Sequence, residues 1–194
     1  MKQVIAIDIE KCVGCHSCQI ACALAHSDAK TLFEARQQEP PVPSRISVLL
    51  VGNTAVAVQC RHCDDPPCVE KCPKDAMQKR DSDGVVTVDP ELCTACKVCI
   101  KVCPLGEFGV ISISPDEEAK TIIKCDMCTE RMSQGLLPAC VEACPTGALV
   151  LMDPEEAAAQ GRLVTVEELA AALHELQQAP QPALSLSGSS GKKQ

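Results

Sequence analysis

The sequence predicts an α+β fold in which short strands and short helices alternate around groups of cysteines. Cysteine makes up 16 of the 194 residues and recurs in groups of four. Short apolar runs typical of strands stand directly before or after these groups. The only aromatic side chains are two Phe, so aliphatic residues must fill the core. The length allows one compact domain or two very small ones.

The cysteines form four repeats, and such repeats indicate recurring structural units. The groups are Cys12, Cys15, Cys18 and Cys22; Cys60, Cys63, Cys68 and Cys72; Cys93, Cys96, Cys99 and Cys103; and Cys125, Cys128, Cys140 and Cys144. Every group ends in C-x3-C, and the first and third have the full spacing C-x2-C-x2-C-x3-C. A proline follows the last cysteine of every group except the first, where Ala23 stands instead.

This spacing is the ligand signature of bacterial ferredoxins, whose cysteine thiolates hold [4Fe–4S] clusters. Three thiolates close in sequence can bind three corners of one cluster. The fourth follows about one helical turn later, so it points away and can reach a neighbouring cluster. Sixteen cysteines make four sets with none left over. We therefore expect four [4Fe–4S] clusters in two close pairs.

Two other uses of the cysteines fit the sequence less well. Zinc sites use C-x2-C pairs, but they do not require a third cysteine two residues on or the C-x3-C-P ending. A disulfide scaffold would suit a secreted chain. The N-terminus has no apolar signal region, no cleavage site and no twin arginine, so we expect a cytoplasmic protein. A reducing compartment disfavours disulfides and favours metal ligation.

The apolar runs place strands beside the cysteine groups. We expect strands at 4–9, 85–88 and 120–125, each leading into a group, and strands at 109–113 and 148–152 that follow one. Short helices should begin near the third and fourth cysteines of each group. Two-stranded sheets with short helices around a cluster pair are the bacterial ferredoxin arrangement. We therefore expect two bacterial-ferredoxin-like units, duplicated βαβ-type modules.

Residues 23–59 form a longer excursion between the first two groups. Its apolar runs at 46–51 and 54–58 flank Gly52 and Asn53, which predicts a β-hairpin with a two-residue turn. Three prolines between 40 and 43 indicate an extended loop before it.

Two short helices are expected after the last cysteine. Asp153 followed by Pro154 is a typical helix start, and this helix should end near Gly161. Thr165 and Glu168 have the spacing of a capping box, which opens an amphipathic helix at 166–178. This helix either caps its own domain or docks on a partner or a second copy.

The expected organisation has three parts. Residues 1–152 form a four-cluster ferredoxin-like domain with the insertion at 23–59. Residues 153–179 form a C-terminal helical extension that contains the two helices expected after the last cysteine. Residues 180–194, rich in Pro, Ser and Gly, form a disordered tail.

Composition and motifs exclude several functions. The net charge of −8 without a basic tract, and only two rings for stacking, argue against nucleic-acid binding. No apolar run approaches the ~18 residues of a membrane span. We find no catalytic triad, dinucleotide fingerprint or phosphate loop, so we expect no enzyme. His26 and His62 are expected to be loop residues, and His62, between two cysteines, could tune a cluster by hydrogen bonding.

The order of the groups, with a long insertion after the first and a stretched fourth, resembles the four-cluster electron-transfer subunits of the dimethyl sulfoxide reductase, formate dehydrogenase and hydrogenase families. The resemblance covers residues 1–152 and rests on all sixteen cysteines. It implies that the outer groups pair with each other and the inner groups with each other. The implied ligand sets are Cys12, Cys15, Cys18 and Cys144; Cys22, Cys125, Cys128 and Cys140; Cys60, Cys63, Cys68 and Cys103; and Cys72, Cys93, Cys96 and Cys99. The sequence alone leaves sequential pairing of the groups open.

A more local match is found at residues 15–27, 30–35, 59–63 and 67–68 and at Pro43. These residues look like the small iron–sulfur proteins encoded with carbon monoxide dehydrogenases and related cytoplasmic oxidoreductases. The resemblance implies an electron-transfer subunit. It would carry single electrons between a redox enzyme and an acceptor protein or flavoprotein. The enzyme would be a carbon monoxide dehydrogenase, an aldehyde or formate oxidoreductase, or a hydrogenase. The alternative is a polymerising or scaffolding subunit that self-associates through its C-terminal helix.

Overall fold

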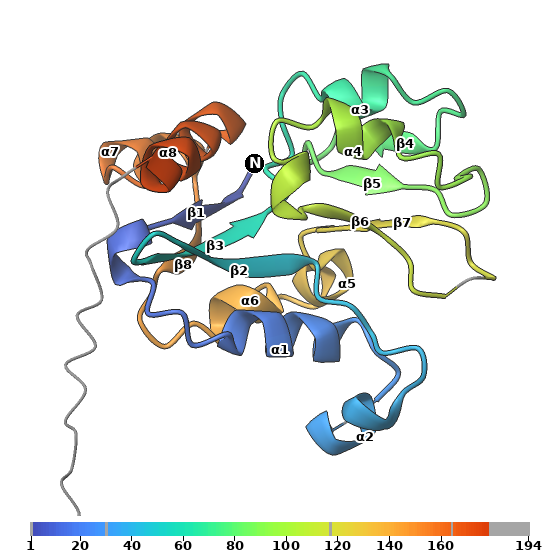
Figure 1. Cartoon of the computed structure of the whole chain (residues 1–194), viewed down its shortest axis with the longest axis horizontal. Helices are drawn as coiled ribbons and strands as arrows, with labels where there is room; N and C mark the ends of the chain where they lie inside the picture. The colour runs from blue at the N-terminus through green and yellow to red at the C-terminus, as the bar shows by residue number, and fades with distance from the viewer. Residues whose placement is uncertain (1, 30, 117, 164, 179–194) are drawn as a thin grey trace, which may run out of the picture.

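The part of the chain that the structure describes has an α+β fold, with four separate two-stranded antiparallel sheets joined by short helices (Figure 1). The computed structural model describes residues 2–29, 31–116, 118–163 and 165–178. The tail expected at 180–194 lies outside these residues. Aliphatic side chains and cysteines make up most of one continuous core cluster, as the scarcity of aromatic residues requires.

The first sheet joins the two ends of the cysteine-rich region. Strand β1 (Val4–Ile7) pairs with β8 (Leu149–Met152), with Val4 opposite Met152 and Ile7 opposite Leu149. All four residues of β1 are buried. The predicted strand at 4–9 is too long, because Ile9–Lys11 form the 3-10 helix η1 that turns the chain into Cys12.

The predicted hairpin is confirmed. Strands β2 (Ile46–Val51) and β3 (Thr54–Gln59) pair along their full length around Gly52 and Asn53. Helices α1 (Ser17–Ala25) and α2 (Leu32–Gln37) precede it. Helix α2 was not expected, although Thr31 caps it by accepting a 3.2 Å hydrogen bond from the backbone N–H of Glu34. That spacing was a readable start signal.

Two shorter sheets hold the middle of the chain. Strand β4 (Met77–Lys79) pairs with β5 (Val86–Val88), and β6 (Ile111–Ile113) pairs with β7 (Ile122–Lys124). The strands expected at 85–88, 109–113 and 120–125 are therefore one to three residues shorter than predicted. Gly109 and Lys120 have positive φ angles of 75° and 42°, which end the extended conformation. Strand β4 was missed because its three residues carry no strand pattern.

The short helices pack in two pairs. Helix α1 packs against α6 (Ala139–Glu142), and α3 (Pro67–Glu70) packs against α4 (Val98–Val102) (Figure 1). Each of these helices contains the third cysteine of its group, as expected. The first pair joins the outer cysteine groups, and the second joins the inner ones. The 3-10 helix η2 (Gly106–Phe108) follows the third group, and α5 (Thr129–Ser133), which was not expected, follows Cys128.

Both helix starts after the last cysteine are confirmed. In α7 (Pro154–Ala159) the Asp153 carboxylate accepts a 2.9 Å hydrogen bond from the N–H of Glu155. In α8 (Val166–Gln178) the Thr165 hydroxyl accepts from the Glu168 N–H at 3.1 Å, and the Glu168 carboxylate accepts from the Thr165 N–H at 2.9 Å. The buried side chains of α8 include Leu173, so this helix packs on its own chain, next to β2.

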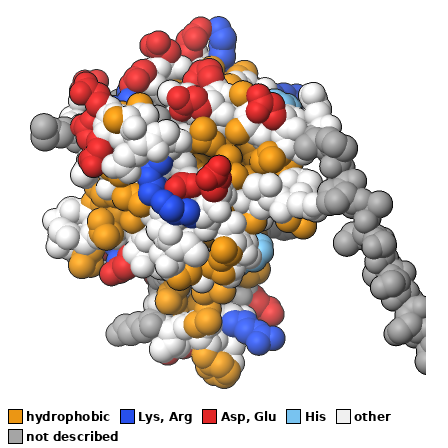
Figure 2. All heavy atoms as spheres, turned by 90° about the vertical axis from the view of Figure 1, so that its left-hand side faces the viewer, with side chains coloured by type: hydrophobic (Ala, Val, Ile, Leu, Met, Phe, Trp, Pro, Cys, Tyr) orange, Lys and Arg blue, Asp and Glu red, His pale blue; other side chains and the backbone are white. Residues whose placement is uncertain are grey.

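The surface is largely acidic where these two helices lie. Figure 2 shows Asp and Glu side chains gathered over the upper part of this face. Helix α7 has Glu155 and Glu156 in its first turn, and α8 has Glu167 and Glu168 in its first turn. Within the described ranges, no helix is both long and apolar enough to cross a membrane.

Candidate metal centres

The outer cysteine groups meet where α1 packs against α6. The thiol of Cys18 lies among those of Cys12, Cys144 and Cys15. Burial raises the pKa of Cys18 to about 11, and the negative charge of these three neighbours adds to the rise. The segment from η1 into α1 supplies the first three thiols, and Cys144 follows the end of α6.

A second set of thiols lies beside the first. Burial raises the pKa of Cys140 far above its ordinary value, and the charges of Cys125, Cys22 and Cys128 reinforce that rise. The backbone N–H of Arg45 also donates to the Cys22 sulfur at 3.3 Å. Cysteines from the two ends of the chain therefore share one buried region.

The inner groups meet in the same way where α3 packs against α4. A hollow is lined by Cys60, Cys63, Cys68 and Cys103. Burial raises the pKa of Cys68 to about 12, with contributions from Cys60, Cys103 and Cys63, whereas the Lys124 ammonium opposes the rise.

The remaining four cysteines line another hollow. Its lining contains Cys72, Cys93, Cys96 and Cys99, together with Ile122. Burial raises the pKa of Cys99, and Cys93 and Cys96 add to it. Each group of four thiols thus takes three cysteines from one repeat and one from the repeat paired with it. Cysteines of the first and fourth groups therefore lie near one another, as do cysteines of the second and third groups.

These groups fit iron–sulfur clusters by their chemistry. Thiolates are the ligands that such clusters use, and buried thiols with raised pKa values lose their protons when metal charge is present. Two buried polar side chains close to Cys60 in the sequence also have unsatisfied hydrogen-bonding atoms. Nε2 of His62 and the side-chain amide of Gln59 have no hydrogen-bond partner within the described part of the chain. Such orphaned groups are rare without an unseen acceptor or donor.

The loops of the first and third groups share a backbone conformation. Gly14 and Ala95 precede the second cysteine of their groups, with φ angles of 66° and 50°. His16 and Lys97 follow that cysteine, with φ angles of 60° and 68°. Since non-glycine residues seldom adopt positive φ, its recurrence indicates one loop design used twice.

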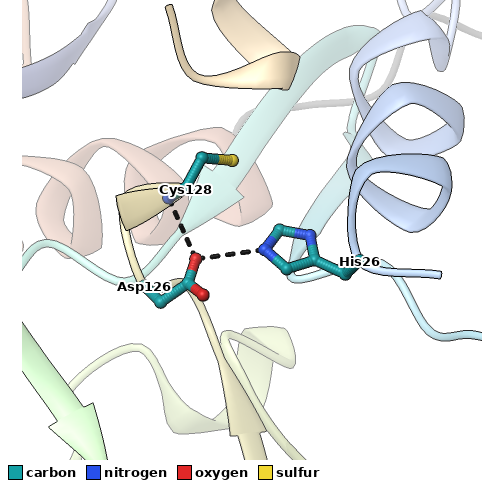
Figure 3. A group of neighbouring side chains, drawn as sticks. All are labelled: His26, Asp126 and Cys128. Carbon is teal, nitrogen blue, oxygen red and sulfur yellow. Dashed lines mark hydrogen bonds and ion pairs between the residues drawn. The ribbon is translucent and has the colours of Figure 1, made fainter. Parts of the chain in front are cut away.

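A charged group borders the second set of thiols (Figure 3). Asp126 accepts hydrogen bonds from His26 Nε2 at 3.1 Å and from the N–H of Cys128 at 2.9 Å, and it pairs with Arg45. His26 Nδ1 lies 2.7 Å from the carbonyl oxygen of Cys22. Burial disfavours a charged His26, but its bonds to Asp126, Cys128 and Cys22 outweigh this and raise its pKa to about 12.

Sequence reasoning found part of this group only. His26 was noted as a loop residue, and the structure gives it a position against Cys22. Asp126 was missed, although its place directly after Cys125 was a usable signal. No sequence feature marks Arg45, which comes from the insertion.

Two buried cations lie between the second and third sets of thiols. The guanidinium of Arg61 donates to the carbonyl oxygens of Ile5 at 2.8 Å and Leu163 at 2.9 Å. The ammonium of Lys124 donates to the carbonyl oxygens of Val86 and Cys125. Both side chains are buried, and the sequence analysis identified neither.

His62 is buried with these cations. Its Nδ1 accepts a 3.0 Å hydrogen bond from the Val86 N–H. Burial lowers the pKa of His62 well below its ordinary value, and the charges of Lys124 and Arg61 lower it further. His62 is therefore neutral, and its Nε2 carries the proton.

The chain resembles known iron–sulfur proteins over most of its length. Residues 52–154, more than half of the chain, match the model of the 4Fe-4S dicluster domain. An "Iron-sulfur protein" of Rhodospirillum rubrum is 40% identical over 157 residues, covering 77% of this chain and 82% of that protein. The putative electron transport protein YsaA of Escherichia coli is 38% identical, covering 80% and 93%.

A third relative is the electron transport protein HydN of Escherichia coli. It is 33% identical over 163 residues, and the match covers 79% of this chain and 89% of that protein. The matched domain contains the second, third and fourth cysteine groups, and the gathered thiols have the chemistry that the domain's name describes. The chain therefore belongs to the 4Fe-4S dicluster domain family.

Proposed function

We propose that this protein is a non-catalytic electron-transfer subunit that carries single electrons through four [4Fe–4S] clusters. The observation that carries the proposal is the gathering of sixteen cysteines into four groups of four thiols. Electron-transport names among the relatives support the same role. The ligand sets are those of outer-with-outer and inner-with-inner pairing.

The order of the clusters follows from cysteines that belong to different ligand sets but lie close to each other. Cys18 and Cys22 lie one helical turn apart on α1, so the first two clusters are neighbours. Cys60 and Cys125 influence each other electrostatically, which relates the second cluster to the third. Cys99 lies in the first turn of α4 and Cys103 directly follows the helix, which connects the third cluster to the fourth. The chain would thus hold the clusters in one row.

The two ends of this row have the most accessible ligands. Cys15 of the first set and Cys96 of the last are exposed, whereas Cys125, Cys128 and Cys140 in the middle are buried. Each cluster would accept and release one electron when bound. The surrounding side chains keep the middle of the row away from water. Electrons would therefore enter and leave near Cys15 and Cys96.

The partner is proposed to be a cytoplasmic redox enzyme. The local resemblance at residues 15–27 and 59–63 favours a carbon monoxide dehydrogenase, ahead of an aldehyde or formate oxidoreductase and a hydrogenase. An acceptor protein or flavoprotein would take the electron at the other end. The scaffolding alternative is less well supported, because the most apolar face of α8 is buried against its own chain.

The test is the metal content of anaerobically purified protein. About 16 iron and 16 acid-labile sulfide per chain, with spin-coupled EPR signals after dithionite reduction, would support four clusters in close pairs. About eight iron would mean two clusters, and zinc in place of iron would refute the proposal.

A further inference from the structure

We propose that Arg61 and Lys124 form a buried pair of cations that raises the reduction potentials of the two middle clusters. This inference rests on the proposed function, because it concerns the clusters held by the second and third ligand sets. Those sets are Cys22, Cys125, Cys128 and Cys140, and Cys60, Cys63, Cys68 and Cys103.

Arg61 lies between the two sets. It stands between Cys60 and Cys63 in the sequence, and its charge interacts with Cys60, Cys125 and Cys63. The first and last of these belong to the third set, and Cys125 belongs to the second. Only 7% of Arg61 is exposed, so water screens these interactions weakly.

Lys124 reaches the same junction from β7. It is the last residue of that strand and precedes Cys125, and its charge opposes the raised pKa values of both Cys125 and Cys68. Cys125 belongs to the second set and Cys68 to the third. Lys124 is 4% exposed, and its ammonium donates to the Cys125 carbonyl oxygen at 2.7 Å.

Backbone carbonyl groups hold both cations in place. Arg61 donates to carbonyl oxygens of β1 and of Leu163, and Lys124 donates to those of Val86 and Cys125. A neutral carbonyl group fixes a cation without cancelling its charge. The Glu168 carboxylate also acts on Arg61 through its charge, so Lys124 gives the cleaner measure of the effect.

The physical consequence concerns the reduced state. Reduction adds one negative charge to a cluster, and a nearby buried cation stabilises that charge more than the oxidised state. The two middle clusters should therefore be easier to reduce than they would be without these cations. Since an electron passes between the two cluster pairs through this junction, the cations would make its arrival on either middle cluster more favourable.

The experiment compares charge-keeping with neutral variants of the full chain. Lys124→Gln and Arg61→Gln remove the charge, whereas Lys124→Arg and Arg61→Lys keep it. Lys101→Gln is the matched control, because Lys101 is exposed on α4 near Cys103. Reduction potentials are read by EPR-monitored titration of anaerobic protein, after iron and sulfide have been counted in each variant.

We expect both Gln variants to shift the potentials of two clusters to more negative values, by more than Lys101→Gln does. The charge-keeping variants should have the reduction potentials of the wild-type protein. Unchanged potentials in fully loaded Lys124→Gln protein would overturn the inference, as would equal shifts or equal cluster loss in Lys124→Gln and Lys124→Arg. If Arg61→Gln does not fold, the comparison of Lys124→Gln with Lys124→Arg still tests the inference. A wild-type protein without iron would instead refute the proposed function itself.

Discussion

The carboxylate of Asp126 accepts a hydrogen bond from His26 over 3.1 Å, although the two residues are 100 positions apart in the chain. This contact joins the end of α1 to the loop before α5. Since His26 also lies against the Cys22 carbonyl oxygen and Asp126 accepts from the Cys128 N–H, the pair connects the backbone at two cysteines of the second set.

Breaking this pair should destabilise the protein. Asp126→Asn removes the negative charge while keeping the shape, and it leaves the partly buried His26 and Arg45 without their counter-charge. We expect the free energy of unfolding to fall by about 2 kcal/mol, the usual cost of an unpaired charged hydrogen-bonding group. Anaerobic chemical denaturation followed by circular dichroism measures it. Glu70→Gln is the control, because its pair with Lys71 is exposed and should contribute almost nothing. Equal effects of the two substitutions would contradict the prediction.

Substitution of single ligands should reveal how the cysteine groups pair. Under outer-with-outer pairing, Cys22→Ser and Cys140→Ser perturb the same cluster, so their reduced EPR spectra should change alike. Cys68→Ser should instead change the signal that Cys103→Ser changes. Sequential pairing predicts another outcome, in which Cys22→Ser resembles Cys68→Ser. That result would refute the proposed ligand sets.

Helix α8 should contribute to the stability of the isolated chain. Leu173 is fully buried, so Leu173→Ala should lower the free energy of unfolding by about 3 kcal/mol through lost burial and a cavity. Thr165→Ala should cost about 1 kcal/mol, because it removes the helix cap. Leu137→Ala is the control, since Leu137 is half exposed. If Leu173→Ala costs no more than this control, α8 acts as an arm for a partner and not as a cap.

Gly106 should tolerate no side chain. A Cβ atom there would lie 2.0 Å from the backbone oxygen of Ile100, so the turn after Cys103 would have to move. We expect Gly106→Ala to cost at least about 3 kcal/mol and to reduce the iron content. Gly135→Ala is the matched control, because among the described residues nothing beyond Gly135 and its chain neighbours lies within 4 Å of the added Cβ. Only the positive φ opposes this substitution, at about 1 kcal/mol. Similar melting temperatures for the two variants would argue against steric exclusion at Gly106.

Local chemistry made much of the fold predictable. The hairpin at 46–59 and the caps at Asp153 and Thr165 were predictable because turn and cap residues act on the backbone beside them. Helix α2 follows the same rule. Its cap residue Thr31 is visible in the sequence, but the helix was not predicted from it. The three-residue strand β4 could not be predicted, because pairing with β5 is what makes it a strand.

The sequence by itself determined the kind of chemistry, because cysteine spacing within a loop decides which thiols can face one cluster. Only the tertiary structure decided which loops meet. Packing of α1 on α6 and of α3 on α4 brings distant cysteines together, and no local pattern specifies such contacts. The buried charges of Arg61 and Lys124 and the half-buried carboxylate of Asp126 are known only from the structure, for the same reason. From its type alone, a charged residue is expected to be solvent-exposed. Whether it is buried depends on which distant segments pack over it.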